Sequence, residues 1–163
     1  MNFMKKMSFL NKLWKQEKIN LVKPSENICN SYIKKAENSL KSASILIKND
    51  LYEDSISKSY YTMYNILTGL LFKTGIKCEN HTASILLLKL LFKENNLYKT
   101  ANSAKKERIE KQYYIEEETT KTAALDMFKD AEEFLINIKL IIKTIKELEI
   151  QNYRNKLKNI VKK

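Results

Sequence analysis

The chain has 163 residues, a length that suits one domain with a core of its own. Its two glycines and one proline provide too few turn residues for a fold built from β-hairpins, which excludes most sheet architectures. The formal net charge is +11, and no apolar stretch is long enough to span a membrane, because Lys89 interrupts the run from Ile85 to Phe92.

The positive charge is concentrated at the two ends of the chain. Residues 1–23 contain six lysines and one glutamate, and residues 150–163 contain five basic residues and no acidic one. Arg108 and Arg154 are the two arginines among the 30 basic residues. Two interpretations remain open: solvated chain ends, or an electropositive surface for RNA or another anionic partner.

An amphipathic helix is predicted close to the N-terminus. Phe3, Met7, Leu10 and Trp14 recur at helical spacing, and lysines occupy the other faces. We expect this helix to dock on the rest of the domain or to form a mobile arm. Its lysine-rich, acid-poor composition also leaves open a helix on a membrane surface or a targeting peptide, but no small-residue cleavage site follows the helix.

Two long helices are predicted between residues 24 and 75. The first begins after the break at Pro24 and ends at about Asn49. The second runs from Glu53 to Thr74, and Gly75 is expected to end it in the left-handed conformation that glycine adopts without strain. The residues expected to face the core recur every three or four positions: Ile28, Tyr32, Ala36, Leu40, Ala43 and Ile47 in the first helix, and Ile56, Tyr60, Met63, Tyr64, Leu67, Leu70 and Leu71 in the second.

Three further helices complete the expected bundle. Asn80 is predicted to cap a helix from His81 to about Lys93, and the pair at 95–96 is predicted to form a turn. A fourth helix is expected over residues 100–114, and a fifth from about Glu116, where three glutamates suit the positive end of the helix dipole. Residues 150–163 are expected to continue this last helix and to fray. Its buried face is predicted to contain Phe128, Ala131, Leu135, Ile138, Ile142, Ile145 and Leu148.

The sequence therefore predicts an all-α fold, an up-and-down bundle of about five helices with an extra amphipathic helix at its N-terminus. We divide the chain into a basic amphipathic helix or arm at 1–23, a bundle at 24–149 and a basic helical tail at 150–163. Cys29 and Cys78 lack the spacing of metal ligands, so we expect two buried thiols in the reducing cytoplasm and no structural disulfide.

Three stretches carry a resemblance to a known family. The first consists of the segments 33–43 and 51–55. The second is Tyr60-Tyr61-Thr62-Met63-Tyr64, followed by Leu70-Leu71, Gly75 and Asn80-His81-Thr82. The third is Arg108 to Tyr113, followed by Ala131-Glu-Glu-Phe134-Leu135. Over about residues 30–145 these stretches resemble the HEPN superfamily, specifically its branch of small stand-alone proteins. The resemblance implies a HEPN-like helical bundle, and the second stretch is the most specific of the three.

The resemblance also identifies what the chain lacks. HEPN ribonucleases use an arginine followed, after four to six residues, by a histidine. The only histidine of this chain is His81, and the residues at the three possible arginine positions are Thr74, Gly75 and Ile76. This departure favours a binding module over an enzyme.

If the chain is nevertheless an enzyme, the resemblance implies a metal-independent endoribonuclease with a rearranged site. His81 would then be the general acid or base, because a histidine titrates near neutral pH. Arg108, from a different helix, would stabilise the phosphate in the transition state. Tyr113 or Tyr114 would complete the catalytic set by orienting the substrate.

If the chain is a binding module, other residues become candidate contacts with RNA or a partner protein. Lys73 and Lys77 lie one position outside the missing motif on either side, and Tyr60, Tyr61 and Tyr114 could stack on bases. Packing in the core or at a dimer interface is the alternative for the tyrosines, because they recur at helical spacing. Lys73 and Lys77 do not replace the missing arginine, because a lysine lacks the planar guanidinium group with which arginine binds phosphate.

Three functional hypotheses follow. The first is a non-catalytic or degenerate HEPN protein, a homodimer in the cytoplasm that binds RNA or a nucleotidyltransferase partner in a toxin–antitoxin or defence-like system, as the resemblance implies. The second is the rearranged endoribonuclease. The third is an adaptor that attaches through its basic N-terminal helix. None of them requires a metal or a cofactor, and a membrane is not an expected partner.

Overall fold

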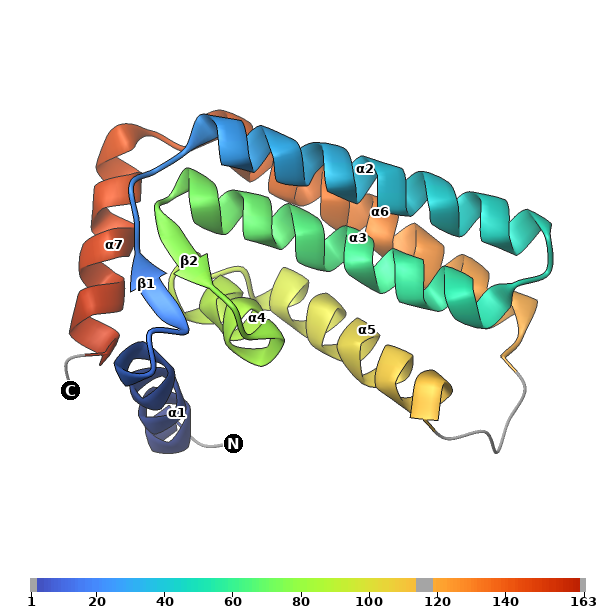
Figure 1. Ribbon diagram of the computed structural model, residues 1–163, viewed down its shortest axis with the longest axis horizontal. Coiled ribbons are helices and arrows are strands. Elements are labelled where there is room, and N and C mark those ends of the chain that lie inside the picture. The colour runs from blue at the N-terminus through green and yellow to red at the C-terminus, as the bar shows by residue number, and fades with distance from the viewer. Residues whose placement is uncertain (1–2, 114–118, 162–163) are drawn as a thin grey trace.

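The computed structural model describes residues 3–113 and 119–161, and the all-α prediction is confirmed (Figure 1). Within these residues the chain forms helices and two short strands. In chain order they are α1 (Phe3–Lys15), β1 (Ile19–Leu21), α2 (Glu26–Lys48), α3 (Tyr52–Lys73), β2 (Ile76–Cys78), α4 (His81–Leu90), α5 (Asn95–Tyr113), α6 (Lys121–Thr144) and α7 (Glu147–Val161).

Helix α3 is the centre of the fold. It packs against α2, α4, α5, α6 and β2, and Figure 1 shows it between α2 on one side and α4 and α5 on the other, with α6 behind. Helices α2 and α3 approach closely because Gly69 has no side chain: a Cβ there would lie 3.3 Å from the carbonyl oxygen of Cys29. No helix among the described residues is long and apolar enough to cross a membrane.

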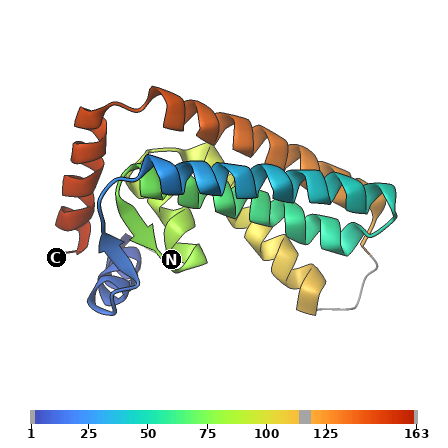
Figure 2. The same cartoon turned by 45° about the horizontal axis from the view of Figure 1, so that its top comes forward.

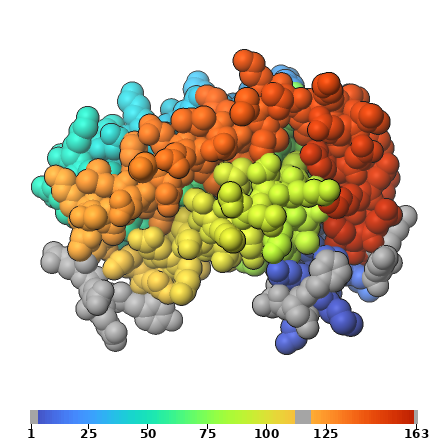
Figure 3. Space-filling view, turned by 180° about the vertical axis from the view of Figure 1, so that it is seen from behind, coloured from blue at the N-terminus to red at the C-terminus, as the bar shows by residue number. Residues whose placement is uncertain are grey.

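The views from other sides show how the remaining helices cover α3. Helix α6 runs along the α2–α3 pair (Figure 2), and on the opposite side of the molecule it lies next to α5 and α4 (Figure 3). Helix α7 adjoins the end of α4, where the rings of Phe92 and Tyr153 lie 4.6 Å apart between centroids. Helix α7 also contacts α1, so the first and last helices of the described residues lie together.

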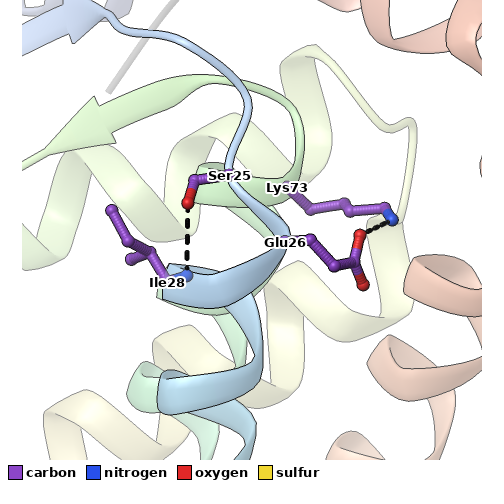
Figure 4. A network of polar contacts seen from close by, with 4 residues as sticks. All are labelled: Ser25, Glu26, Ile28 and Lys73. Atoms are coloured by element: carbon purple, nitrogen blue, oxygen red, sulfur yellow. Dashed lines mark hydrogen bonds and ion pairs between the residues drawn. The ribbon is translucent and has the colours of Figure 1, made fainter.

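Side-chain caps fix where three of the helices begin. Ser25 accepts a hydrogen bond from the backbone N–H of Ile28 at the start of α2 (Figure 4), and Asn80 accepts one from Ala83 at the start of α4, as predicted. Thr120 caps α6, so this helix begins at Lys121, and the expected start near residue 116 is wrong. Residues 114–118 lie outside the described part of the chain.

The turn between α4 and α5 lies earlier than the sequence indicated. Helix α4 ends at Leu90, and the reversal is made by Lys93, whose φ angle is +61°. Helix α5 already begins at Asn95, so the predicted turn at residues 95–96 is wrong. A left-handed lysine carries no sequence signal, which is why the two asparagines were the more obvious turn candidates.

Two residues predicted to be buried are exposed. Ile28 is 40% exposed because Cys29, the next residue, takes the buried position in the first turn of α2. Leu148 is 73% exposed because α6 ends at Thr144 and the extended backbone of Ile145 breaks the helical period. The segment after this break is a separate helix, α7, and the predicted fraying continuation of α6 is wrong.

Helix α1 is joined to the bundle through a small β-ribbon. Strands β1 and β2 are antiparallel, with Ile19 opposite Cys78. Helix α1 contacts both β1 and α7, and the core that it shares with them contains buried side chains from both chain ends. Docking and a mobile arm were both expected for the N-terminal helix, and the structure has the docked arrangement, with these side chains buried: Leu10, Leu13, Leu157 and Val161.

One arginine joins the ribbon, α3 and α7. From α7, Arg154 donates hydrogen bonds of 2.7 Å from Nη1 to the carbonyl oxygens of both Val22 and Gly75, and one of 3.4 Å to that of Thr74. Gly75 has the predicted left-handed conformation, with φ of +68°. A Cβ at this residue would lie 2.0 Å from Arg154 Nη1, so both the backbone angle and the contact require glycine.

We predict that Arg154→Gln lowers the free energy of unfolding by about 1.5–3 kcal/mol, the usual contribution of hydrogen bonds to a charged group. Chemical denaturation followed by circular dichroism measures the change. Lys158→Gln is the matched control, because it removes the same charge from an exposed residue of the same helix. Equal stability of the two variants would contradict a structural role for the arginine.

Candidate functional site

The side chains of three helices meet around the single histidine. Helix α3 contributes Tyr60, Tyr61 and Tyr64, at positions i, i+1 and i+4, and His81 is the first residue of α4. Helix α5 contributes Arg108 and Lys105, which lie on one face of it because they are three residues apart. We refer to these residues, together with Thr82, as the histidine cluster.

The imidazole of His81 is held by its tyrosine neighbours. The hydroxyl of Tyr60 and Nδ1 of His81 share a hydrogen bond of 2.6 Å, which either tautomer of the histidine can form. The ring of Tyr64 stacks on the imidazole with centroids 3.6 Å apart, and Tyr61 meets it edge-on at 6.4 Å. Tyr60 is buried, whereas His81, Tyr61 and Tyr64 are half-buried, so the cluster reaches the molecular surface.

Two cations of α5 complete the cluster. The guanidinium carbon of Arg108 lies 5.2 Å from the ring centroid of Tyr61 and 5.6 Å from that of Tyr60, distances at which a cation is attracted to an aromatic face. Lys105 donates a hydrogen bond from Nζ to Oγ1 of Thr82, the second residue of α4. The cations therefore lie beside the start of α4.

The electrostatics of the cluster favour a neutral histidine. Burial lowers the pKa of His81 below its ordinary value of 6.5, and the positive charges of Lys105 and then Arg108 lower it further. Burial and the charge of Arg108 also lower the pKa of Lys105. No carboxylate of the described residues contributes to either shift. The charges that shift these two pKa values are therefore positive, and an anion placed beside them would stabilise both cations.

The phenol of Tyr60 is a weak acid in this setting. Burial raises its pKa, as does the neighbouring Tyr64, whereas the charge of Arg108 lowers it. The tyrosine therefore keeps its proton at physiological pH and serves as a hydrogen-bond partner of His81.

The remaining predicted residues lie elsewhere. Lys73 forms an ion pair with Glu26 across the ends of α3 and α2 (Figure 4), and Lys77 forms one of 2.6 Å with Glu79. Tyr113 is the last residue of α5, but its side chain lies outside the described residues. Tyr114 lies outside them altogether.

The structure thus brings together four residues named from the sequence, namely Tyr60, Tyr61, His81 and Arg108. Sequence reasoning missed Lys105 as a member of the cluster. Its spacing of three residues from Arg108 was the available signal, because this spacing places two side chains on one face of a helix.

We predict that Lys105→Gln raises the pKa of His81 toward 6.5 but leaves it below that value, because burial remains. NMR titration measures this without ambiguity, since the chain has one histidine. The control is Lys106→Gln, an exposed lysine on the same helix, which should leave the pKa unchanged. A parent pKa of 6.5 or above would contradict the proposed environment.

The same pKa shift has a consequence for stability. The folded pKa of His81 is below that of the unfolded chain, so the unfolded chain binds a proton first as the pH falls. The contribution of neutral His81 to the free energy of unfolding is therefore complete above about pH 6.5, the ordinary pKa of histidine. It is lost as the pH falls toward the pKa of His81 in the folded protein.

Comparisons with known proteins place the chain in a family. A family model described as "HEPN domain" matches residues 29–149, which include the whole histidine cluster. The UPF0332 protein PH1297 of Pyrococcus horikoshii is 38% identical over 61 residues. That match covers 37% of this chain and 43% of the relative, so the chain spans less than half of the relative's length. A HEPN domain suggests a nucleotide-related or RNA-binding role. The family predicted from the tyrosine and histidine motifs is confirmed, and the chain belongs to the HEPN domain family.

Proposed function

We propose that this HEPN domain protein is an RNA-binding module, and that the histidine cluster holds a phosphate of the RNA next to one of its bases. The observation that carries the proposal is the convergence of Arg108 and Lys105 on a half-buried aromatic surface, next to a histidine whose neutral form is favoured. RNA presents both of the required chemical groups, a phosphate for the cations and a flat base for the aromatic rings.

The residues of the cluster have complementary roles in this proposal. The guanidinium of Arg108 can donate two parallel hydrogen bonds to one phosphate, and Lys105 supplies a second positive charge. Tyr61 is half-buried, so the part of its ring that reaches the surface can stack on a base. Neutral His81 has a second ring nitrogen that remains a hydrogen-bond partner when Nδ1 binds Tyr60.

A second candidate function is supported by the neutral state of His81. If Nδ1 donates its hydrogen to Tyr60, Nε2 is unprotonated and can remove a proton from the 2′-hydroxyl of a ribose. Arg108 would then stabilise the charge that develops on the phosphate. This is the metal-independent endoribonuclease expected as the alternative, with its histidine and arginine on different helices.

The proposed partners of the protein remain predictions. They are a second copy of the chain and a nucleotidyltransferase of a toxin–antitoxin or defence-like system. The adaptor hypothesis is less well supported, because Leu10 and Leu13 of α1 are buried in the protein's own core, where they do not contact a partner.

We predict that Arg108→Gln weakens binding of single-stranded RNA by about 10- to 100-fold, because hydrogen bonds from a charged group contribute about 1.5–3 kcal/mol. The slope of log affinity against log salt should also fall by about 0.7, the value for one lost phosphate contact on a single strand. Fluorescence anisotropy with a labelled oligonucleotide measures both quantities. Lys106→Gln is the control, since this side chain is 76% exposed and lies on the same helix. Equal losses in the two variants would show that the cluster has no specific role.

The ribonuclease alternative predicts RNA cleavage that persists in EDTA. This cleavage should disappear in His81→Ala and in Arg108→Ala, and a gel assay with labelled RNA measures it. Absence of cleavage by the parent protein, at concentrations where it binds RNA, would refute the alternative and leave the binding module in place.

A further inference from the structure

We infer that the bound RNA is single-stranded and extends from the histidine cluster along α3 to a second stacking site formed by Tyr32 and Phe72. This inference deepens the proposed function and rests on it. It adds a binding site at a distance from the histidine cluster, with unpaired bases as its ligand.

The path is defined by the partly exposed face of α3. Tyr61, Asn65 and Phe72 are half-buried and lie at positions i, i+4 and i+11, which share one face of a helix, whereas Thr68, at i+7 on that face, is buried. In Figure 1, α3 runs between α2 on one side and α4 and α5 on the other. At a rise of 1.5 Å per residue, Tyr61 and Phe72 are about 16 Å apart along the helix axis.

The far end of the path is aromatic. The rings of Tyr32, from α2, and Phe72, from α3, stack with centroids 5.7 Å apart and planes at 11°. Both side chains are half-buried. Phe72 also lines an open hollow at the start of α2, whose other apolar walls are Val22, Pro24 and Ile28. An unpaired base entering this hollow would meet an aromatic ring and aliphatic side chains, the contacts that bind bases without regard to sequence.

The middle of the path is polar. Asn65 donates a hydrogen bond of 3.3 Å from Nδ2 to Oγ of Ser39, which lies on α2. Both residues are half-buried, and each has polar atoms with capacity for a further hydrogen bond to a sugar or a base edge. The path thus has aromatic rings at its two ends and a polar pair between them.

Positive charge accompanies both aromatic ends. Arg108 and Lys105 lie at the histidine cluster, and Nζ of the exposed Lys35 lies 4.8 Å from the ring centroid of Tyr32. Lys73 and Lys77 also lie at the Tyr32 end, where their partners are Glu26 and Glu79.

These two ion pairs do not prevent a phosphate from binding at the Tyr32 end of the path. Glu26 and Glu79 are largely exposed, with side-chain exposures of 57% and 54%. Ion pairs of this kind contribute about 0–1 kcal/mol, so a phosphate can compete for the lysines.

The arrangement selects a single strand. In a duplex the faces of the bases are stacked on one another and are not available to side chains, whereas unpaired bases can be splayed out onto aromatic rings. Two aromatic sites separated along one helix would hold two unpaired bases of the same strand, and the cations beside each site would hold its phosphates.

The test is the affinity of a labelled 12-nucleotide RNA, measured by anisotropy with the parent protein and its variants. We expect Tyr32→Leu to weaken binding by about 5- to 100-fold, the loss that follows removal of one stacked base. Tyr98→Leu is the matched control, because Tyr98 is also a half-buried tyrosine with a lysine, Lys89, 5.5 Å from its ring. We also expect an RNA duplex of equal length to bind more weakly than the single strand.

A second variant distinguishes a loss of RNA binding from a loss of folding. Lys35→Gln changes an exposed residue outside the core, and should lower the salt slope by about 0.7 without loss of thermal stability. If Lys35→Gln and Tyr32→Leu bind as the parent does while Arg108→Gln is impaired, the inference is overturned and the proposed function stands. Equal binding of duplex and single strand also overturns the inference. If the parent binds no RNA, both fail.

Discussion

The reversal of the chain at Gly75 is the constraint on which the rest of the structure depends. Helix α3 carries the three tyrosines, but His81 reaches them only because the chain turns back at Gly75 and runs through β2. The turn requires a positive φ and a position where Arg154 can approach the backbone to within hydrogen-bonding distance. A side chain at residue 75 would displace the arginine and, with it, the contact between α7 and the ribbon.

The two arginines of the chain show why net charge is a poor guide to this protein. Arg154 belongs to the basic C-terminal segment, yet its guanidinium binds backbone carbonyls at the end of α3, where the helix dipole is negative. Arg108 lies in a part of the chain where the charge is nearly balanced, yet it lies over two tyrosine rings beside the histidine. What a cation does here depends on its neighbours and little on the charge of its segment.

The long helices and the start of α4 at His81 could be predicted from the sequence, because apolar residues at a period of 3.6 and the cap at Asn80 are local signals. Strand β1 could not, since three residues are too few for a periodic pattern and its existence depends on pairing with β2. The start of α5 was missed because the left-handed backbone of Lys93, which makes the turn before it, carries no sequence signal. Lys105 was missed because its partner, Thr82, belongs to a different helix.

The chemistry of the histidine cluster favours binding over cleavage. Cleavage of RNA by its own 2′-hydroxyl needs a base for that hydroxyl and an acid for the leaving oxygen. Neutral His81 can be the base, but Tyr60 is a poor acid, because it is buried and its pKa is raised. Binding needs only cations and aromatic rings, and both are in place. Burial, and then the positive charges of Lys105 and Arg108, lower the pKa of His81, so the imidazole lacks the second proton that the leaving group would need.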